Sequence, residues 1–77
     1  MGSRLAHSTF YEPLIEALIA KRHALGLAQE VVNDMIGCCD ALVSKWECRM
    51  RYPSAHHLML WAQVLKMRVF AQDLAHV

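Results

Sequence analysis

The stretch that decides the fold reads Gln29-Glu30-Val31-Val32-Asn33-Asp34-Met35-Ile36-Gly37-Cys38, continues with Val43-Ser44-Lys45-Trp46-Glu47 and ends at Pro53-Ser54. Val32 and Ile36 recur at helical spacing before a single glycine, and Val43 and Trp46 resume that spacing after it. Gly37 allows a positive φ and therefore a sharp turn. The pattern predicts two short helices that share one core and are joined by a turn of about three residues, a helix-turn-helix.

Helical periodicity continues on both sides of this stretch. The predicted helices cover about 11–25, 28–36 and 39–48, a fourth begins at Pro53-Ser54, and Phe70, Leu74 and Val77 indicate a short fifth. Pro13 falls in the first turn of its helix, where proline is tolerated, and Gly26 stands where a helix end favours glycine. We expect an all-α, five-helix domain over residues 11–77, preceded by a flexible segment over residues 1–10.

The chain is short and apolar. It has 77 residues, which make one small domain, and its 56% of hydrophobic residues against 19% of charged ones exceed what such a small core buries. Trp46 and Trp61 lie on apolar stripes, so we expect both in the core rather than exposed for stacking. The apolar residues that the core cannot bury predict a homodimer, with the fifth helix and the outer face of the fourth as a twofold interface.

Charge is distributed unevenly along the chain, whose net charge is +1. Residues 1–43 carry three basic and five acidic side chains, whereas residues 44–77 carry five basic and two acidic ones. Positive charge therefore gathers after the predicted third helix, which favours an anionic partner. Because the sequence has neither an apolar run of about 20 residues nor a signal-peptide core, we expect a cytoplasmic protein without membrane contact.

The reactive side chains indicate neither a metal site nor catalysis. Cys38, Cys39 and Cys48 are an odd number of cysteines, which favours reduced thiols. Together with His56-His57 they match no paired Cys/His spacing of a zinc site, so we expect no metal and no cofactor. No nucleophile and base are paired by the pattern, and a small helical domain leaves little room for a catalytic pocket. We expect a binding protein rather than an enzyme.

Several motifs together resemble one known family. The segments Arg22-x-x-x-Gly26-Leu27-Ala28-Gln29, Val43-Ser44-Lys45-Trp46-Glu47 and Pro53-Ser54 are similar in order and spacing to the lambda-repressor-like (Cro/repressor, Xre) helix-turn-helix family. The resemblance covers about residues 14–69, most of the chain. It implies a compact helical domain that places its third helix in the major groove of double-stranded DNA.

The resemblance also assigns roles to individual residues. It implies that Gln29 contacts a DNA phosphate and steadies the third helix, and that Arg22 and Glu47 form a buried ion pair. On the third helix it assigns the DNA-facing positions to Cys39, Asp40, Ala41, Leu42, Ser44 and Lys45. In relatives the segment after this helix grips the phosphate backbone, and here that segment supplies Arg49, Arg51, Tyr52 and Ser54.

Four residues depart from the pattern of the family. Asn33 replaces an alanine inside the second helix, and a buried amide there needs hydrogen-bond partners. Arg49 stands where relatives end the third helix with glycine, so it must take a positive φ or let the helix continue. Ala28 and Cys39 replace the Ser or Thr that caps the second and third helices, and such a cap contributes about 1 kcal/mol.

Two functions remain open at this point. Lys45 and the basic segment after the third helix favour a DNA-binding transcriptional regulator, such as a repressor of phage or mobile-element type. Asp40, Ala41 and Leu42 offer few bonds to bases or phosphates and favour a helix-turn-helix turned to protein interaction, such as an adaptor, antirepressor or antitoxin-like partner. Of the two, we expect the DNA-binding regulator.

Overall fold

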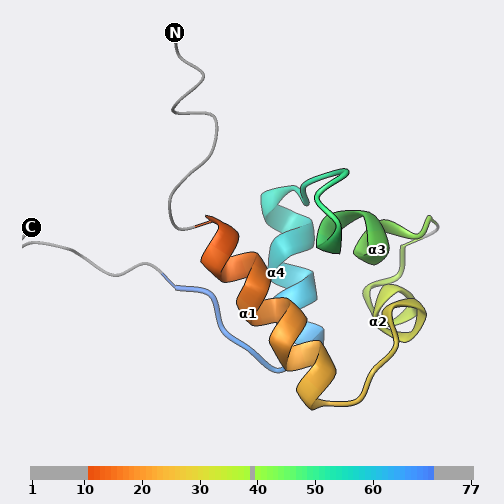
Figure 1. Cartoon of the computed structure of the whole chain (residues 1–77), viewed down its shortest axis with the longest axis horizontal. Coiled ribbons are helices and arrows are strands. Elements are labelled where there is room, and N and C mark those ends of the chain that lie inside the picture. The colour runs from red at the N-terminus through yellow and green to blue at the C-terminus, as the bar shows by residue number, and fades with distance from the viewer. Residues whose placement is uncertain (1–10, 39, 71–77) are drawn as a thin grey trace, which may run out of the picture.

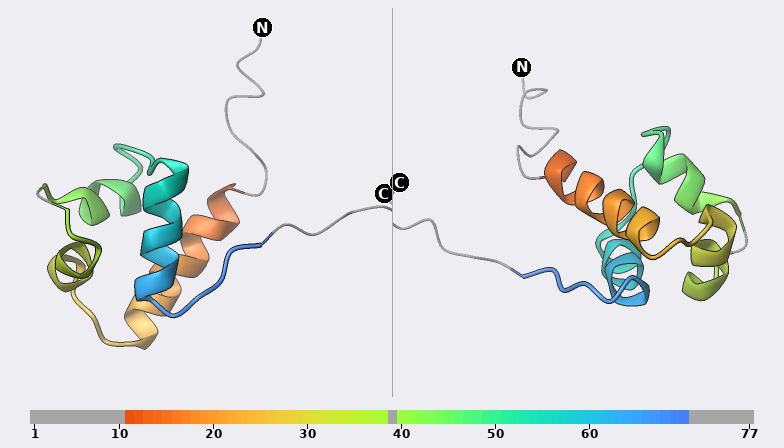
Figure 2. Two further views of the ribbon diagram at one scale, coloured as in Figure 1. Left: turned by 180° about the vertical axis from the view of Figure 1, so that it is seen from behind. Right: turned by 60° about the horizontal axis from the view of Figure 1, so that its bottom comes forward.

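The computed structural model describes residues 11–38 and 40–70. They form four α-helices, α1 (Tyr11–Ala24), α2 (Gln29–Ile36), α3 (Leu42–Glu47) and α4 (Ala55–Val64), and no β-strand. In Figures 1 and 2, α4 lies between α1 and the α2–α3 pair. The described part of the chain is therefore all-helical, as the sequence predicted.

The helices meet in one hydrophobic core. Trp46 of α3 and Trp61 of α4 lie at its centre with their ring centroids 5.3 Å apart, and both are buried. The core consists of Ile15, Leu18, Val32, Val43, Trp46, Leu58, Trp61, Ala62 and Leu65, so every helix contributes to it. The predicted burial of both tryptophans is confirmed, and α3, although short, is anchored through two of its six residues, Val43 and Trp46.

The first two helices end at the predicted glycines. The predicted ranges 11–25 and 28–36 each agree with α1 and α2 to within one residue. Gly26 and Gly37 adopt φ values of 68° and 91°, the left-handed region that glycine enters without a steric penalty. The Gly37 amide donates to the carbonyls of Asn33 and Asp34, which closes the end of α2. The chain then turns towards α3.

The predicted third helix, 39–48, is too long. The helix begins at Leu42 and ends at Glu47, so the connection from α2 spans residues 37–41 rather than about three residues. Asp40 and Ala41 therefore precede α3, where a place on the helix was predicted, and Cys39 lies outside the described residues. Ala41 provides no side-chain cap, and the first amides of α3 bond instead to a side chain of α2. Figure 1 views α2 along its axis and α3 from the side, so the two helices cross steeply.

Of the predicted fifth helix, only Phe70 lies among the described residues, and it is not helical. After α4 the chain turns at Lys66, which has a φ of 62°, and residues 67–70 follow without helical structure. Phe70 is 71% exposed and does not join the core. The other residues of that prediction, Leu74 and Val77, lie outside the described residues, as does the segment 1–10 that was predicted to be flexible.

Candidate nucleic-acid interface

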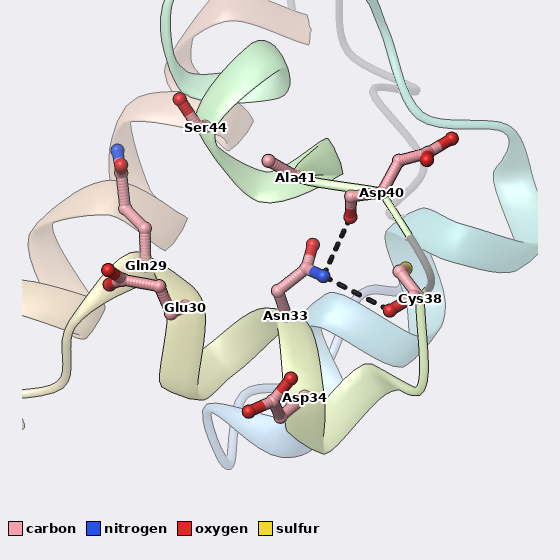
Figure 3. A pocket seen from close by; sticks show the side chains of 8 residues that line it. All are labelled: Gln29, Glu30, Asn33, Asp34, Cys38, Asp40, Ala41 and Ser44. Atoms are coloured by element: carbon pink, nitrogen blue, oxygen red, sulfur yellow. Dashed lines mark hydrogen bonds between the residues drawn. The ribbon is translucent and has the colours of Figure 1, made fainter.

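The N-terminal end of α3 is held by one side chain of α2. Asn33 is 8% exposed, and its Oδ1 accepts hydrogen bonds from the backbone amides of Leu42 at 3.0 Å and Val43 at 3.2 Å. Its Nδ2 donates to the carbonyls of Asp40 at 2.7 Å and Cys38 at 3.2 Å (Figure 3). The buried amide therefore has the partners that it needs. A residue of α2 performs the capping that Ala41 cannot.

The C-terminal end of α3 is held by a buried ion pair. Arg22 of α1 donates from Nε to Glu47 Oε2 at 2.7 Å and from Nη2 to Glu47 Oε1 at 2.9 Å, and both side chains are at most 10% exposed. Glu47 raises the pKa of Arg22 by accepting these hydrogen bonds. Arg22 also donates to the Leu27 carbonyl at 2.8 Å. The ion pair implied by the family resemblance is present, and it joins α1, the α1–α2 turn and α3.

Gln29 extends this ion pair to α2. Its Nε2 donates to Glu47 Oε1 at 2.8 Å, so the first residue of α2 is bonded to the last residue of α3. This contact supports the expectation that Gln29 steadies the third helix. The N-cap of α2, Ala28, provides no side-chain hydrogen bond, so the first amides of α2 beside Gln29 are left without a side-chain cap.

Arg49 is turned towards α1 rather than away from the domain. It adopts a φ of 65°, which is the first of the two conformations considered for this position. Its guanidinium donates from Nε to Glu12 Oε1 at 2.9 Å and from Nη2 to Glu16 Oε2 at 2.6 Å, and Nη1 donates to the Glu47 carbonyl. These hydrogen bonds, led by the one to Glu12, raise the pKa of Arg49. The predicted phosphate contact of Arg49 would compete with two carboxylates.

Other residues after α3 keep their polar groups at the surface. Arg51 and Tyr52 are exposed, and the ring of Tyr52 contacts that of Tyr11 with a centroid distance of 5.3 Å. Arg51 forms no ion pair with another described residue. Ser54 is the N-cap of α4, where its Oγ accepts from the His57 amide at 3.2 Å. The segment therefore presents Arg51, a cation that no described carboxylate pairs with, and a helix start capped by Ser54.

Only three of the predicted DNA-facing residues, Leu42, Ser44 and Lys45, belong to α3. Ser44 and Lys45 are half-buried, and neither side chain bonds to another described residue. Leu42 is also half-buried, but it packs against the core. The polar outer surface of α3 is therefore narrower than predicted and centres on Ser44 and Lys45.

An acidic hollow lies between α2 and α3. It has a volume of about 450 Å³ and is lined by Gln29, Glu30, Asn33, Asp34, Cys38, Asp40, Ala41 and Ser44 (Figure 3). Glu30, Asp34 and Asp40 are exposed, and none of the three carboxylates pairs with a basic side chain of the described residues. The hollow thus brings together Asp40, Ala41, Ser44 and Gln29 from the predicted site, and adds two acidic residues of α2 that the prediction did not include.

Two further features were missed in the sequence. The capping role of Asn33 was not predicted, although an amide inside an apolar helix together with two missing Ser/Thr caps was its signal. The carboxylates that bind Arg49 were also missed, because Glu12 and Glu16 lie 37 and 33 residues away in the chain. Their spacing of i and i+4 on α1 was the available sign, since it places both on one face of the helix.

Comparisons of the chain with protein-family models, with curated proteins and with solved structures found no match. Among the described residues, no group of three His, Cys, Asp or Glu side chains is placed to hold a metal ion, and Cys48 is a free thiol. No helix over residues 11–38 and 40–70 is long and apolar enough to span a membrane.

Proposed function

We propose that this chain is a DNA-binding transcriptional regulator of the lambda-repressor-like helix-turn-helix kind, with α3 as the helix that enters the major groove. The observation that carries the proposal is the attachment of α3. A six-residue helix crosses α2 steeply and is bonded to the rest of the domain at both of its ends, through Asn33 and through Arg22. Such a fixed, projecting helix fits a major groove about 12 Å wide.

In this proposal, side chains on α3 and on the connection before it contact the base edges. Lys45 is a donor suited to guanine, and Ser44 pairs with several base edges. Asp40 and Ala41 reach the same surface from the connection, where Asp40 accepts from the amino group of cytosine and Ala41 contacts the methyl group of thymine. This small set predicts sequence preference at a few base pairs of each half-site.

Phosphate binding falls to groups on both sides of α3. Arg51 and Tyr52 are exposed after the helix, and the uncapped first amides of α2 lie beside Gln29 before it. Arg49 is not among the proposed phosphate ligands because its guanidinium is held by Glu12 and Glu16. We propose instead that Arg49 fixes the segment from which Arg51 and Tyr52 project.

The regulator binds as a homodimer in this proposal, with half-sites about one helical turn apart. Exposed apolar side chains support a second copy, since Met59 on α4 is 46% exposed and Phe70 is 71% exposed. Sedimentation velocity at high micromolar concentration checks this part separately. A dimer is the expected result, and a monomer under these conditions contradicts it.

The test of the function is selection of bound sites from a random DNA pool, followed by fluorescence anisotropy with a selected and a random duplex over a salt series. We expect enrichment of a pseudo-palindrome and affinity that falls steeply as salt rises. Lys45→Ala reduces the preference for the selected duplex by about 1–3 kcal/mol, whereas Arg51→Ala weakens both duplexes and lowers the salt slope by about one unit.

Arg68→Ala is the matched control for Arg51→Ala. Both substitutions remove one exposed arginine that forms no ion pair with a described residue. The segment 65–70 runs along the α1 side of the domain, away from α3 (Figures 1 and 2). We expect Arg68→Ala to leave the salt slope nearly unchanged. Absence of binding to any duplex at low salt would reject the DNA-binding function.

One observation favours a second candidate function. The hollow between α2 and α3 carries Glu30, Asp34 and Asp40, which form no ion pair within the described part of the chain, and such a surface repels phosphate. A helix-turn-helix that binds a basic protein partner, as an adaptor or antirepressor, accounts for this charge. Under that alternative the selection enriches no DNA sequence, and Asp40→Asn raises affinity for random DNA by reducing the repulsion.

A further inference from the structure

One buried amide, the side chain of Asn33, joins α2 to the connection that follows it and to the start of α3. Asn33 and Arg22 are the buried polar residues of the described chain, and Asn33 is the uncharged one. An amide group has two N–H donors and an oxygen that accepts two hydrogen bonds. All four capacities of Asn33 are used, by two carbonyls of the connection and two amides of α3.

The four bonds restrict α3 in two ways. The acceptor atom bridges the consecutive amides of Leu42 and Val43, which fixes where the helix begins. The donor atom holds the carbonyls of Cys38 and Asp40, which fixes the path of the chain that leads into it. Figure 3 shows the Asn33 side chain pointing from α2 to this connection. A local Ser or Thr cap would satisfy the α3 amides without bonding α3 to α2.

We infer that Asn33 is a positioning residue that sets the orientation of α3 on α2, and with it the direction in which Ser44, Lys45 and Asp40 face. The part of this inference that concerns DNA rests on the proposed function. The structural part stands without it, because it concerns two amides of α3 and one side chain of α2. Both Asn33 and Ser44 line the hollow, so a change in the angle between the helices moves the surface that the base edges would meet.

Asn33→Ala and Asn33→Asp separate the bonds of this side chain. Alanine removes all four, whereas aspartate keeps an oxygen acceptor for Leu42 and Val43 and loses the donors to Cys38 and Asp40. Val32→Ala is the matched control, since Val32 is the adjacent residue of α2, is fully buried and contributes packing without side-chain hydrogen bonds. Val32→Ala lowers the stability of the fold and leaves the four hydrogen bonds of Asn33 in place.

The first readout is amide hydrogen exchange measured by NMR on the free proteins, with Trp61 as the core reference. In Asn33→Ala we expect the Val43 amide to lose about tenfold in protection relative to Trp61, because its acceptor on Asn33 is gone. The Leu42 amide keeps its hydrogen bond to the Asp40 carbonyl at 2.8 Å and should lose less. In Asn33→Asp and Val32→Ala the ratio should stay within about twofold of the wild type. Unchanged relative protection of the Val43 amide in Asn33→Ala overturns the inference. If that variant does not fold, a loss of relative protection beyond twofold in Asn33→Asp, which keeps the acceptor oxygen, overturns it.

The second readout is the affinity ratio between the selected and the random duplex. We expect this ratio to fall about tenfold in Asn33→Ala, to recover in part in Asn33→Asp, and to stay near the wild-type value in Val32→Ala. Equal ratios in Asn33→Ala and Val32→Ala would reduce Asn33 to a stabilising residue and contradict a positioning role. If the wild type binds no DNA, the proposed function fails, and the exchange measurement alone decides whether Asn33 holds α3.

Discussion

The two ends of α3 are attached by different chemistry. The N-terminal end depends on one neutral side chain, Asn33, which makes four hydrogen bonds to backbone groups. The C-terminal end depends on charges, with Glu47 paired to Arg22 inside the domain and Arg49 paired to two carboxylates at its surface. Neutral hydrogen bonds are insensitive to salt, buried ion pairs are weakly screened, and exposed pairs are strongly screened. The two ends should therefore respond differently to mutation, salt and pH.

The largest effect is expected from Glu47→Ala. This change leaves the Arg22 guanidinium buried without its carboxylate, and breaking such a pair lowers the free energy of unfolding by about 3–5 kcal/mol. Urea denaturation followed by circular dichroism measures the loss. The double variant Arg22→Met with Glu47→Ala should lose less than Glu47→Ala alone, because no unpaired charge remains. A double variant that is less stable than the single one would contradict this account of the C-terminal end.

The next effect is expected from Asn33→Ala at the other end. It removes the four hydrogen bonds of the amide, although the Leu42 amide and the Asp40 carbonyl keep the bond between them, and it lowers the free energy of unfolding by about 1–3 kcal/mol. Because Asn33 is neutral, the loss should be the same at low and high salt when urea titrations are compared. A strong salt dependence of this difference would show that the N-terminal end also depends on charge.

A smaller effect is expected at Arg49, whose ion pairs stabilise the fold while its positive φ destabilises it. Arg49→Ala removes exposed ion pairs, a loss below about 1 kcal/mol, and keeps a non-glycine residue at a φ of 65°. Arg49→Gly removes the same pairs but relieves the backbone, by about 1 kcal/mol. Thermal unfolding should rank Arg49→Gly above Arg49→Ala in stability. The opposite order would mean that the turn is not strained at this residue.

Repeating these measurements in high salt isolates the ion pairs of Arg49. We expect the wild type to lose most of its advantage over Arg49→Ala at about 1 M salt, since Glu12 and Glu16 are exposed and the Debye length there is about 3 Å. The difference between wild type and Glu47→Ala should change little. Equal salt sensitivity of both differences would remove the distinction between the buried and the exposed pairs.

The smallest effect is expected at Tyr11, which contacts Tyr52 after α3. Burial is the main cause that raises the pKa of Tyr11 above 10.0, so the folded state retains the phenolic proton longer than the unfolded state. The resulting stability is complete below pH 10.0 and is lost as pH rises through the folded-state pKa. In Tyr11→Phe the free energy of unfolding, measured by urea denaturation at a series of pH values, should fall less steeply above pH 10.0 than in the wild type.

At neutral pH the same substitution is expected to be nearly neutral or slightly stabilising. The Tyr11 hydroxyl is buried without a hydrogen-bond partner among residues 11–38 and 40–70, and removing such a group relieves its desolvation. Urea denaturation at pH 7 and above pH 10 tests both expectations with one pair of proteins. A marked loss of stability at pH 7 would show that the Tyr11 hydroxyl makes a stabilising hydrogen bond.

The sequence predicts the parts of this domain that depend on local patterns. Gly26 and Gly37 marked the ends of α1 and α2, because a positive φ at a helix end favours glycine. The Arg22–Glu47 pair followed from the family resemblance. The start of α3 was misplaced because its cap comes from Asn33 on another helix, and no local signal at Asp40 or Ala41 records that contact. The ion pairs of Arg49 were not predicted for the same reason, since its partners Glu12 and Glu16 lie on α1.

The most direct test of the account is an NMR titration of the labelled protein with the selected duplex, monitored at each backbone amide. We expect shifts at Gln29, Ser44, Lys45 and Arg51, small changes over Lys66 to Phe70, and unchanged spectra with the duplex at high salt. Shifts confined to α4 and the segment after it, or no shifts at low salt, would contradict the assignment of α3 to the major groove.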